Sequence, residues 1–254
     1  MNPLPTVSVI VVTRDRPQLL ADALASVAAQ SRSPLEVRVG DDGCDTSTAV
    51  ADGVSLLEVT VLPLSCGQPG AARNAAAAGA RGDVLAFLDD DDLWRPEHLA
   101  GLAAAFVDGG VGFAWRDSEV VREALAEDGM RAPLARLTLA RDWEDTLMHS
   151  DDYLPPSSWG VRRDVFERLG GFDTRFRYSE DWDFALRAAA ATRVQRVPGV
   201  TVEVRLRATG NASAEFTPER LDCLRRLGER HGFPAPEPKT FWEVALALGE
   251  AAHP

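Results

Sequence analysis

The sequence predicts an α/β fold built on a mainly parallel sheet that is flanked by helices. Over the first hundred residues, short apolar runs alternate with stretches in which apolar residues recur at helical spacing. Several of the apolar runs stop at a turn-forming or acidic cluster, as at residues 40–43 and 89–92. This order of strands and helices is typical of parallel sheets, whose ligands bind at the carboxyl ends of the strands.

Seven elements are expected in the first 110 residues. The strands are β-branched or apolar runs at residues 7–12, 35–39, 56–62 and 84–88. The helices are expected from Pro17 to about Val27, over residues 70–80 and over about 96–107. In the first of these helices the apolar positions share one face, which consists of Leu19, Leu20, Ala23, Leu24 and Val27.

The pattern loosens past residue 110, where a long polar segment separates two short strands. Strands are expected at 111–115, at 157–161 and, in one or two pieces, within 194–206. Helices are expected at 164–169, 180–190, 218–230 and 240–251. We therefore divide the chain into an α/β half (1–110), a second, smaller half of the same domain (111–214) and a C-terminal helical extension (215–254).

Charge and composition exclude several classes of function. The net charge of −12 disfavours general binding to nucleic acid or to an anionic membrane. Lys239 is the only lysine, which excludes a phosphate-binding loop of the Walker type. The three cysteines, Cys44, Cys66 and Cys223, are odd in number and widely spaced, which indicates free thiols in a reducing compartment.

The chain is expected to be cytoplasmic. It begins without the charged and apolar regions of a signal peptide, and no stretch reaches the roughly 18 apolar residues of a membrane helix. The helix expected at 218–230 carries arginines beside leucines. Association with a membrane surface therefore remains open, although packing of this helix on the core is favoured.

Four consecutive aspartates, Asp89 to Asp92, follow the apolar run at 84–88. Adjacent like charges need water, hydrogen-bond donors or a cation to compensate them. Oxygen ligands of this kind suit Mg²⁺ or Mn²⁺ holding the phosphates of a substrate. The alternative is a solvated acidic turn ahead of the next helix. Two more polar clusters, at residues 13–15 and 41–42, also follow strands, and a parallel sheet places all three on one rim.

Five segments in order resemble glycosyltransferase family 2. They are residues 7–17 (VSVIVVTRDRP, similar to VSVIIPTYNRP), 40–44 (GDDGC, similar to VDDGS), 70–75 (GAARNA, similar to GxAxARNxG), 87–92 (FLDDDD, similar to FLDxDD) and 170–173 followed by Glu180-Asp181 (similar to GGFDE…ED). Each segment alone is a weak signal. Together they cover about residues 7–190 with the spacing of the family.

The resemblance implies the GT-A fold and transfer of a sugar, with inversion, from a nucleotide-diphospho-sugar to an acceptor hydroxyl. It assigns residues 1–110 to the donor and 111–214 to the acceptor and the chemistry. Asp181 corresponds to the catalytic base, and Asp91, in the DxD motif, to the ligand of Mn²⁺ or Mg²⁺. The residues expected to bind the donor are Thr13, Asp15, Asp41, Arg73, Asp89 and Asp90. Because Asp41 corresponds to an aspartate that binds uracil, UDP- or dTDP-sugars are expected, whereas the acceptor (saccharide, lipid-linked or small molecule) remains open.

The sequence departs from the family pattern in two places. Arg14-Asp15 replaces the Tyr-Asn pair, so an arginine plane is expected in place of tyrosine stacking on the base. The stretch at 204–210 contains no histidine, whereas family members often place there a histidine that helps to hold the metal. Low metal affinity, or binding that depends on the donor diphosphate, is therefore expected.

Weaker assignments concern the aromatic residues and two rival functions. Trp94, Trp159 and Trp182 are candidates for stacking on a sugar, with Trp159 favoured, although a buried aromatic is more often core. One rival is a sugar-phosphate nucleotidyltransferase, but the segment after the first strand lacks the expected glycine-rich loop. The other is a non-catalytic nucleotide-sugar-binding subunit, which should have lost Asp181 or Asp91.

Overall fold

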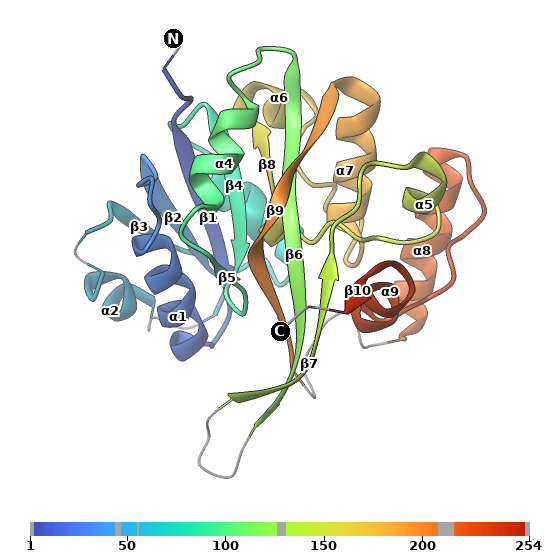
Figure 1. The fold of residues 1–254 in the computed structure, drawn as a ribbon, viewed down its shortest axis with the longest axis horizontal. Coiled ribbons are helices and arrows are strands. Elements are labelled where there is room, and N and C mark those ends of the chain that lie inside the picture. Colours follow the sequence, from blue (N-terminus) through green and yellow to red (C-terminus); the bar gives the residue numbers. More distant parts are fainter. Residues whose placement is uncertain (1–2, 44–46, 55, 126–130, 208–215, 252–254) are drawn as a thin grey trace.

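The computed structural model describes residues 3–43, 47–54, 56–125, 131–207 and 216–251, which fold around one ten-stranded sheet (Figure 1). The strands are β1 (Val7–Thr13), β2 (Glu36–Asp41), β3 (Val59–Pro63), β4 (Val84–Asp89), β5 (Leu93–Trp94), β6 (Val111–Leu125), β7 (Arg131–Leu139), β8 (Trp159–Arg162), β9 (Arg193–Leu206) and β10 (Glu250–Ala251). The helices are α1 (Pro17–Ala28), α2 (Ser47–Asp52), α3 (Pro69–Ala77), α4 (His98–Ala105), α5 (Asp145–Met148), the 3₁₀ turn η1 (Pro156–Ser158), α6 (Arg163–Arg168), α7 (Glu180–Ala191), α8 (Pro218–His231) and α9 (Phe241–Leu248).

The N-terminal part of the sheet is parallel, in the order β4-β1-β2-β3. Its register places Thr13 level with Asp41 and Val12 level with Asp89. The polar clusters that follow these strands therefore meet at the same carboxyl edge, as the sequence predicts. Beyond β4 the sheet becomes mixed, because β8 pairs with β4 and β6 in the antiparallel sense while β9 runs parallel to β6.

The core extends across both halves of the chain. Residues 84–88 of β4 are almost fully buried, which is why this strand is a continuous apolar run and does not alternate. Phe87 of this strand belongs to an aromatic cluster with Trp159, Phe172 and Phe184, in which the ring centroids of contacting pairs lie 4.9–6.0 Å apart. Trp159 is fully buried in this cluster, so its favoured assignment as a sugar-stacking platform was wrong.

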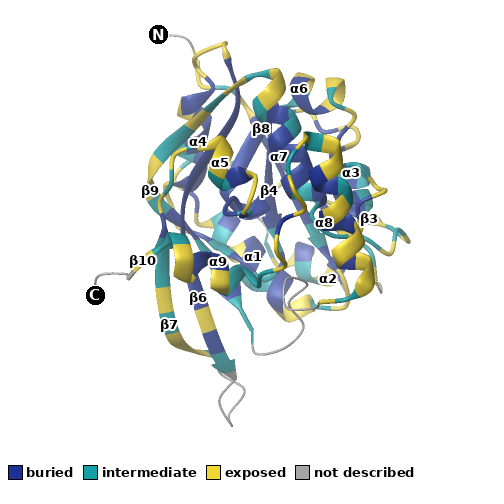
Figure 2. Ribbon diagram, turned by 90° about the vertical axis from the view of Figure 1, so that its right-hand side faces the viewer, coloured by how far each residue is buried: buried dark blue, intermediate teal, exposed yellow. Residues whose placement is uncertain are grey.

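Strand β6 is fifteen residues long, although the sequence pattern predicted only residues 111–115. Its outer part forms a hairpin with β7 that projects from the body of the molecule (Figures 1 and 2). Here Glu119 contacts Arg136 of β7 and lies 3.0 Å from Arg95. Charged pairs of this kind contribute to the ladder beside the buried Val120 and Val121. A pattern based on hydrophobicity does not detect such a strand.

The C-terminal helices pack against the second half of the chain. Helix α8 begins at the N-cap Thr217, ends at the left-handed Gly232 and buries Leu224 and Leu227. Helix α9 begins with a capping box and ends at Leu248, where the expected helix gives way to β10. No helix in the described parts of the chain is long and apolar enough to cross a membrane.

The cysteines agree with the expectation of free thiols where the structure describes them. Cys66 is partly buried and Cys223 is buried on α8, and both are free. Cys44, in the segment that resembles VDDGS, lies outside the described residues.

Candidate active site

A cavity of about 540 Å³ opens at the carboxyl edge of the parallel strands. One wall comes from the ends of β1, β4 and β9 and from the first turns of α3. The opposite wall comes from residues 150–156, the start of α7 and parts of α8 and α9. The cavity therefore lies between the two halves of the chain and is bordered by the C-terminal helices.

Most of the residues that the sequence singles out line this cavity. They are Thr13, Arg73, Asp89, Asp90, Asp91 and Asp181. Asp15 and Asp41 are not among the lining residues. Asp41 is buried and accepts a hydrogen bond from the backbone N–H of Gly43 (3.1 Å). Its neighbour Asp42 lines the cavity instead and accepts from the backbone N–H of Gly67 (2.8 Å).

The four aspartates after β4 have different partners. Asp90 accepts a hydrogen bond from the Thr13 hydroxyl (2.7 Å), and burial, followed by the charge of Asp91, raises the pKa of Asp90 to about 6. Asp92 accepts from the Ser157 hydroxyl (2.6 Å) and from the Arg205 backbone N–H (3.0 Å). Its buried carboxylate therefore ties β4 to η1 and β9 and is not free to bind a ligand.

Asp89 is bound by Arg73, which also contacts the start of α7. The Arg73 guanidinium lies 2.5 Å from Asp89 and 2.8 Å from Glu180. Burial alone lowers the pKa of Arg73, but the two carboxylates outweigh it and hold the pKa above its usual value. Arg73 is therefore a buried, permanently charged bridge between the acidic rim at the end of β4 and the start of α7.

The three acids in the first turn of α7 differ in what they can do. Glu180 is held by Arg73, and the fully buried Asp183 is held by Arg187 (2.8 Å) and His231 (2.9 Å). Asp181 makes no ion pair with any described residue and accepts a hydrogen bond from the backbone N–H of Trp182 (2.8 Å). Glu180 and Asp181 both line the cavity, and of these two Asp181 is the one whose carboxylate has no salt bridge to a described residue.

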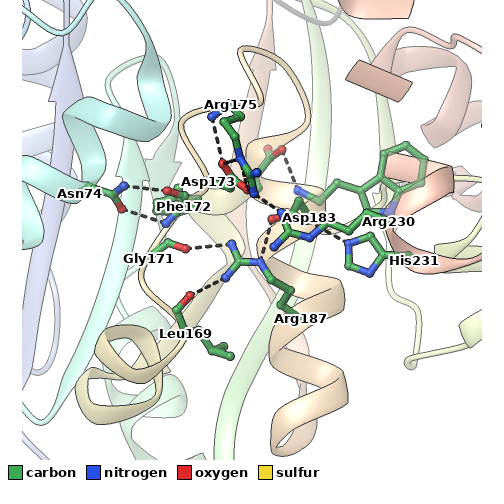
Figure 3. A network of polar contacts seen from close by, with 12 residues as sticks. Asn74, Leu169, Gly171, Phe172, Asp173, Arg175, Asp183, Arg187, Arg230 and His231 are labelled. Carbon is green, nitrogen blue, oxygen red and sulfur yellow. Dashed lines mark hydrogen bonds and ion pairs between the residues drawn. The ribbon is translucent and has the colours of Figure 1, made fainter. Parts of the chain in front are cut away.

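A polar network fixes the orientation of α7 (Figure 3). Asn74 of α3 exchanges two hydrogen bonds with the backbone of Phe172, at 2.8 and 2.9 Å. Arg187 of α7 donates to the carbonyl oxygens of Leu169 and Gly171. Through these contacts the Gly170-Gly171-Phe172-Asp173 segment connects α3 in the first half of the chain to α7.

A further acid, Asp152, lies in the cavity wall and was not singled out from the sequence. Burial, followed by the charge of Asp181, raises the pKa of Asp152 well above its usual value. Burial likewise raises the pKa of Asp181. These two carboxylates therefore interact electrostatically within the cavity wall. An adjacent acid pair at 151–152 was the available signal, but it lies in the polar segment that shows no periodicity.

The carboxylates at this edge of the sheet fit a divalent cation that is held jointly by the protein and by the phosphates of a substrate. No group of three or more His, Cys, Asp or Glu within the described ranges is arranged to hold a metal by itself. The carboxylates of Asp89 and Asp91 nevertheless reach the cavity, with 27% and 20% of their side chains exposed. Mg²⁺ and Mn²⁺ are commonly held by one or two carboxylates together with substrate phosphates, so this donor set fits.

The stretch expected to lack a metal-binding histidine carries arginines where it is described. Arg205 and Arg207 lie at the end of β9, and both line the cavity. Residues 208–210 of the same stretch lie outside the described part of the chain. Neither arginine was assigned a role from the sequence.

Comparison with known proteins agrees with this architecture. The profile of the family described as Glycosyl transferase family 2 matches residues 8–170. An uncharacterized glycosyltransferase of Bacillus subtilis, YwdF, is 33% identical over 230 residues, which cover 89% of this chain and 84% of YwdF. The succinoglycan biosynthesis protein ExoO of Rhizobium meliloti is 28% identical over 200 residues, covering 72% of this chain and 56% of ExoO.

Two solved structures share the fold. TarS 1–349 of S. aureus, crystallised with UDP-GlcNAc, superimposes with a TM-score of 0.69 at 20% identity and covers 96% of this chain and 71% of that chain. The mannosyltransferase PcManGT of Pyrobaculum calidifontis, solved with GDP-Man and Mn²⁺, gives a TM-score of 0.66 at 20% identity, covering 97% and 70%. The expected GT-A fold is confirmed. Because the family profile spans more than half of the sequence and a relative is similar over most of its length, the chain belongs to glycosyltransferase family 2 and is a glycosyltransferase.

Proposed function

We propose that this glycosyltransferase is an inverting, divalent-cation-dependent enzyme that uses a UDP- or dTDP-sugar. The single observation that carries the proposal is the position of Asp181. It lies in the cavity wall across from the acidic rim, while the acids on either side of it, Glu180 and Asp183, are bound by arginine or histidine. A cavity with a phosphate-binding rim on one side and, at the start of α7 on the other, a carboxylate without a salt bridge suits one displacement at a sugar carbon.

In this reaction Asp181 acts as the general base. The acceptor hydroxyl attacks the anomeric carbon, a new carbon–oxygen bond forms, and the bond from that carbon to the phosphate oxygen breaks. The hydroxyl proton passes to the Asp181 carboxylate, and the nucleoside diphosphate leaves with the bonding electron pair. Attack from the side opposite the leaving group inverts the anomeric centre. A base placed in this way contributes about 10²–10⁴-fold to the rate.

On the donor side we assign Thr13, Asp15, Asp41, Arg73, Asp89 and Asp90 to nucleotide binding and Asp91 to the cation. When bound, Mn²⁺ or Mg²⁺ neutralises charge on the departing diphosphate. Arg73 holds Asp89 and Glu180 in place, and the Thr13 hydroxyl orients Asp90. These contacts keep the rim preorganised, so that little rearrangement accompanies donor binding.

The preference for uracil or thymine depends on Asp41, whose carboxylate would accept a hydrogen bond from a pyrimidine N–H. Asp42, which lines the cavity, is a second candidate for this contact. Guanine is the competing base, because the mannosyltransferase PcManGT was solved with GDP-Man, whereas TarS was crystallised with UDP-GlcNAc.

We assign residues 1–110 to the donor, 111–214 to the acceptor and the chemistry, and 215–254 to a helical extension.

The acceptor enters on the side formed by residues 150–156 and by the C-terminal helices. This wall combines acids (Asp151, Asp152) with apolar side chains (Trp182, Phe241), an arrangement that suits a polyhydroxylated molecule, whether saccharide, lipid-linked or small. The rival of a non-catalytic subunit is disfavoured because both Asp181 and Asp91 are present and line the cavity.

Thermal-shift measurements with UDP-, dTDP-, GDP- and CDP-sugars plus Mn²⁺, followed by transfer assays with the stabilising donor, test the proposal. We expect UDP- or dTDP-sugars to raise the melting temperature. Stabilisation by GDP-sugars alone would contradict the assignment of Asp41. Stabilisation without any sugar transfer to a panel of acceptors, under conditions in which hydrolysis of the donor is also undetectable, would favour the binding-subunit alternative.

A further inference from the structure

The hydroxyl of Ser157 closes the turn that carries the four aspartates. Ser157 lies in η1 and is fully buried. Its Oγ atom accepts a hydrogen bond from the backbone N–H of Asp89 (3.1 Å) and donates one to Oδ2 of Asp92 (2.6 Å). The backbone N–H of Asp92 in turn donates to the carbonyl oxygen of Asp89 (3.1 Å). One side chain from the second half of the chain thus binds both ends of the turn.

Asp90 and Asp91 are the two central residues of this turn, and both line the cavity. A turn whose ends are fixed leaves its two central residues few backbone conformations. The Ser157 hydroxyl therefore limits the directions in which these two carboxylates can point. Ser157 itself is not among the residues that line the cavity, so it would act on a ligand only through the turn.

Other contacts hold η1 in place without the Ser157 hydroxyl. The carbonyl oxygen of Ser157 accepts a hydrogen bond from the indole N–H of Trp94 (2.7 Å). The hydroxyl of the next residue, Ser158, donates to the carbonyl oxygen of Pro155 (2.8 Å). Removing the Ser157 hydroxyl should therefore leave η1 docked on the sheet and change chiefly the turn.

We propose that Ser157 is a positioning residue for the cation site, whose hydroxyl holds the turn at residues 89–92 in the shape in which Asp89 and Asp91 bind a divalent cation. The proposal rests on the proposed function, because it takes Asp91 as the cation ligand. Hydrogen-bonding partners that orient metal-binding side chains commonly set the metal affinity. Because residues 150–156 of the opposite wall lead directly into η1, the same hydroxyl also joins that wall to the acidic rim.

Calorimetry of the full chain tests this role in the Ser157→Ala variant. UDP is titrated at a series of Mn²⁺ concentrations and in EDTA. The quantity compared with wild type is the Mn²⁺ concentration that gives half of the full gain in UDP affinity. We expect this concentration to rise about 10- to 100-fold, as for the loss of a group that orients a metal ligand. The UDP affinity in EDTA should not change, because Ser157 does not line the cavity.

Ser158→Ala is the matched control for the loss of a buried hydroxyl. Ser158 is the next residue of η1 and is buried to the same degree (1% exposed, against 0% for Ser157), but its hydroxyl binds Pro155 and not the rim. Both variants should lower the melting temperature, whereas only Ser157→Ala should raise the Mn²⁺ requirement. If Ser157→Ala does not fold, Ser157→Cys replaces it, because a thiol has a similar shape and forms only weak hydrogen bonds.

The outcomes distinguish this inference from the proposed function. An unchanged Mn²⁺ requirement in the Ser157 variant, or an equal rise in Ser158→Ala, overturns the positioning role while cation-dependent donor binding by the wild type stands. A wild-type enzyme that binds UDP equally well with Mn²⁺ and in EDTA, or does not bind it at all, overturns the proposed cation or donor assignment and, with it, the role of Ser157.

Discussion

Arg73 donates a hydrogen bond to Glu180 across 2.8 Å, and through this contact α3 in the first half holds the start of α7 in the second. The same guanidinium binds Asp89 on the acidic rim. Asp181 follows Glu180 directly, so its position relative to the rim is fixed through a neighbour that is itself bound.

Asp181→Asn should reduce sugar transfer by about 10²–10⁴-fold, because the amide keeps the size of the side chain and cannot accept the proton. The dissociation constant of the nucleotide and the melting temperature should change little. Transfer rate, UDP calorimetry and thermal unfolding measure the three quantities. Asp183→Asn is the control, since it breaks a buried ion pair and should lower the melting temperature. A variant at Asp181 that remains active would place the base elsewhere, with Asp152, which also lines the cavity, the next candidate.

UDP should bind weakly when no divalent cation is present. The carboxylates of the rim repel phosphates unless a cation lies between them. Calorimetry of UDP with Mn²⁺ and in EDTA measures the difference, and Asp91→Asn should reduce it. Equal affinities in the two conditions would remove the assignment of Asp91 to the metal and leave the arginines as the cations that bind the donor.

Arg73→Met should destabilise the protein and reduce transfer together. Breaking one side of a buried ion pair costs about 3–5 kcal/mol, and here two carboxylates, Asp89 and Glu180, lose their partner. Urea unfolding at pH 7 measures the free energy of unfolding. Glu180→Gln tests the same contact from the other side and should cost less, because Arg73 retains Asp89. Wild-type stability in Arg73→Met would show that the bridge has no structural role.

The acid limb of the pH–rate profile should lie above the ordinary aspartate range of about 3.9. Burial raises the pKa of Asp181, and transfer requires its ionised form, so the rate falls as the pH drops through this raised pKa. Burial, followed by the charge of Asp181, raises the pKa of Asp152 well above its usual value, so Asp152 still carries its proton where Asp181 titrates. Asp152→Asn should therefore leave the acid limb in place. Profiles of kcat/KM against pH for both enzymes check this, and a limb that moves to lower pH in Asp152→Asn would show that Asp152 is ionised when the base titrates.

The local sequence predicted the parallel half of the fold well, because its signals lie within single elements. The apolar run at 84–88 and the helix beginning at Pro17 are found where the pattern places them. The length of β6 was underestimated, because contacts of its outer part, such as that between Glu119 and Arg136, join residues on different strands. Cross-strand partners are set by the register of the sheet and not by periodicity along one strand.

The sequence by itself determined the fold class, the family and the acids expected at the rim and at the start of α7. Only the tertiary structure decided which of those acids retain a carboxylate without a salt bridge. Asp183 is bound by His231, 48 residues away, and Asp91 by Arg207, 116 residues away. Partners at such separations are chosen by packing. Burial and neighbouring charges decide whether a carboxylate is ionised and whether it is available to a ligand. The sequence identifies the carboxylate, whereas the tertiary structure supplies the neighbours.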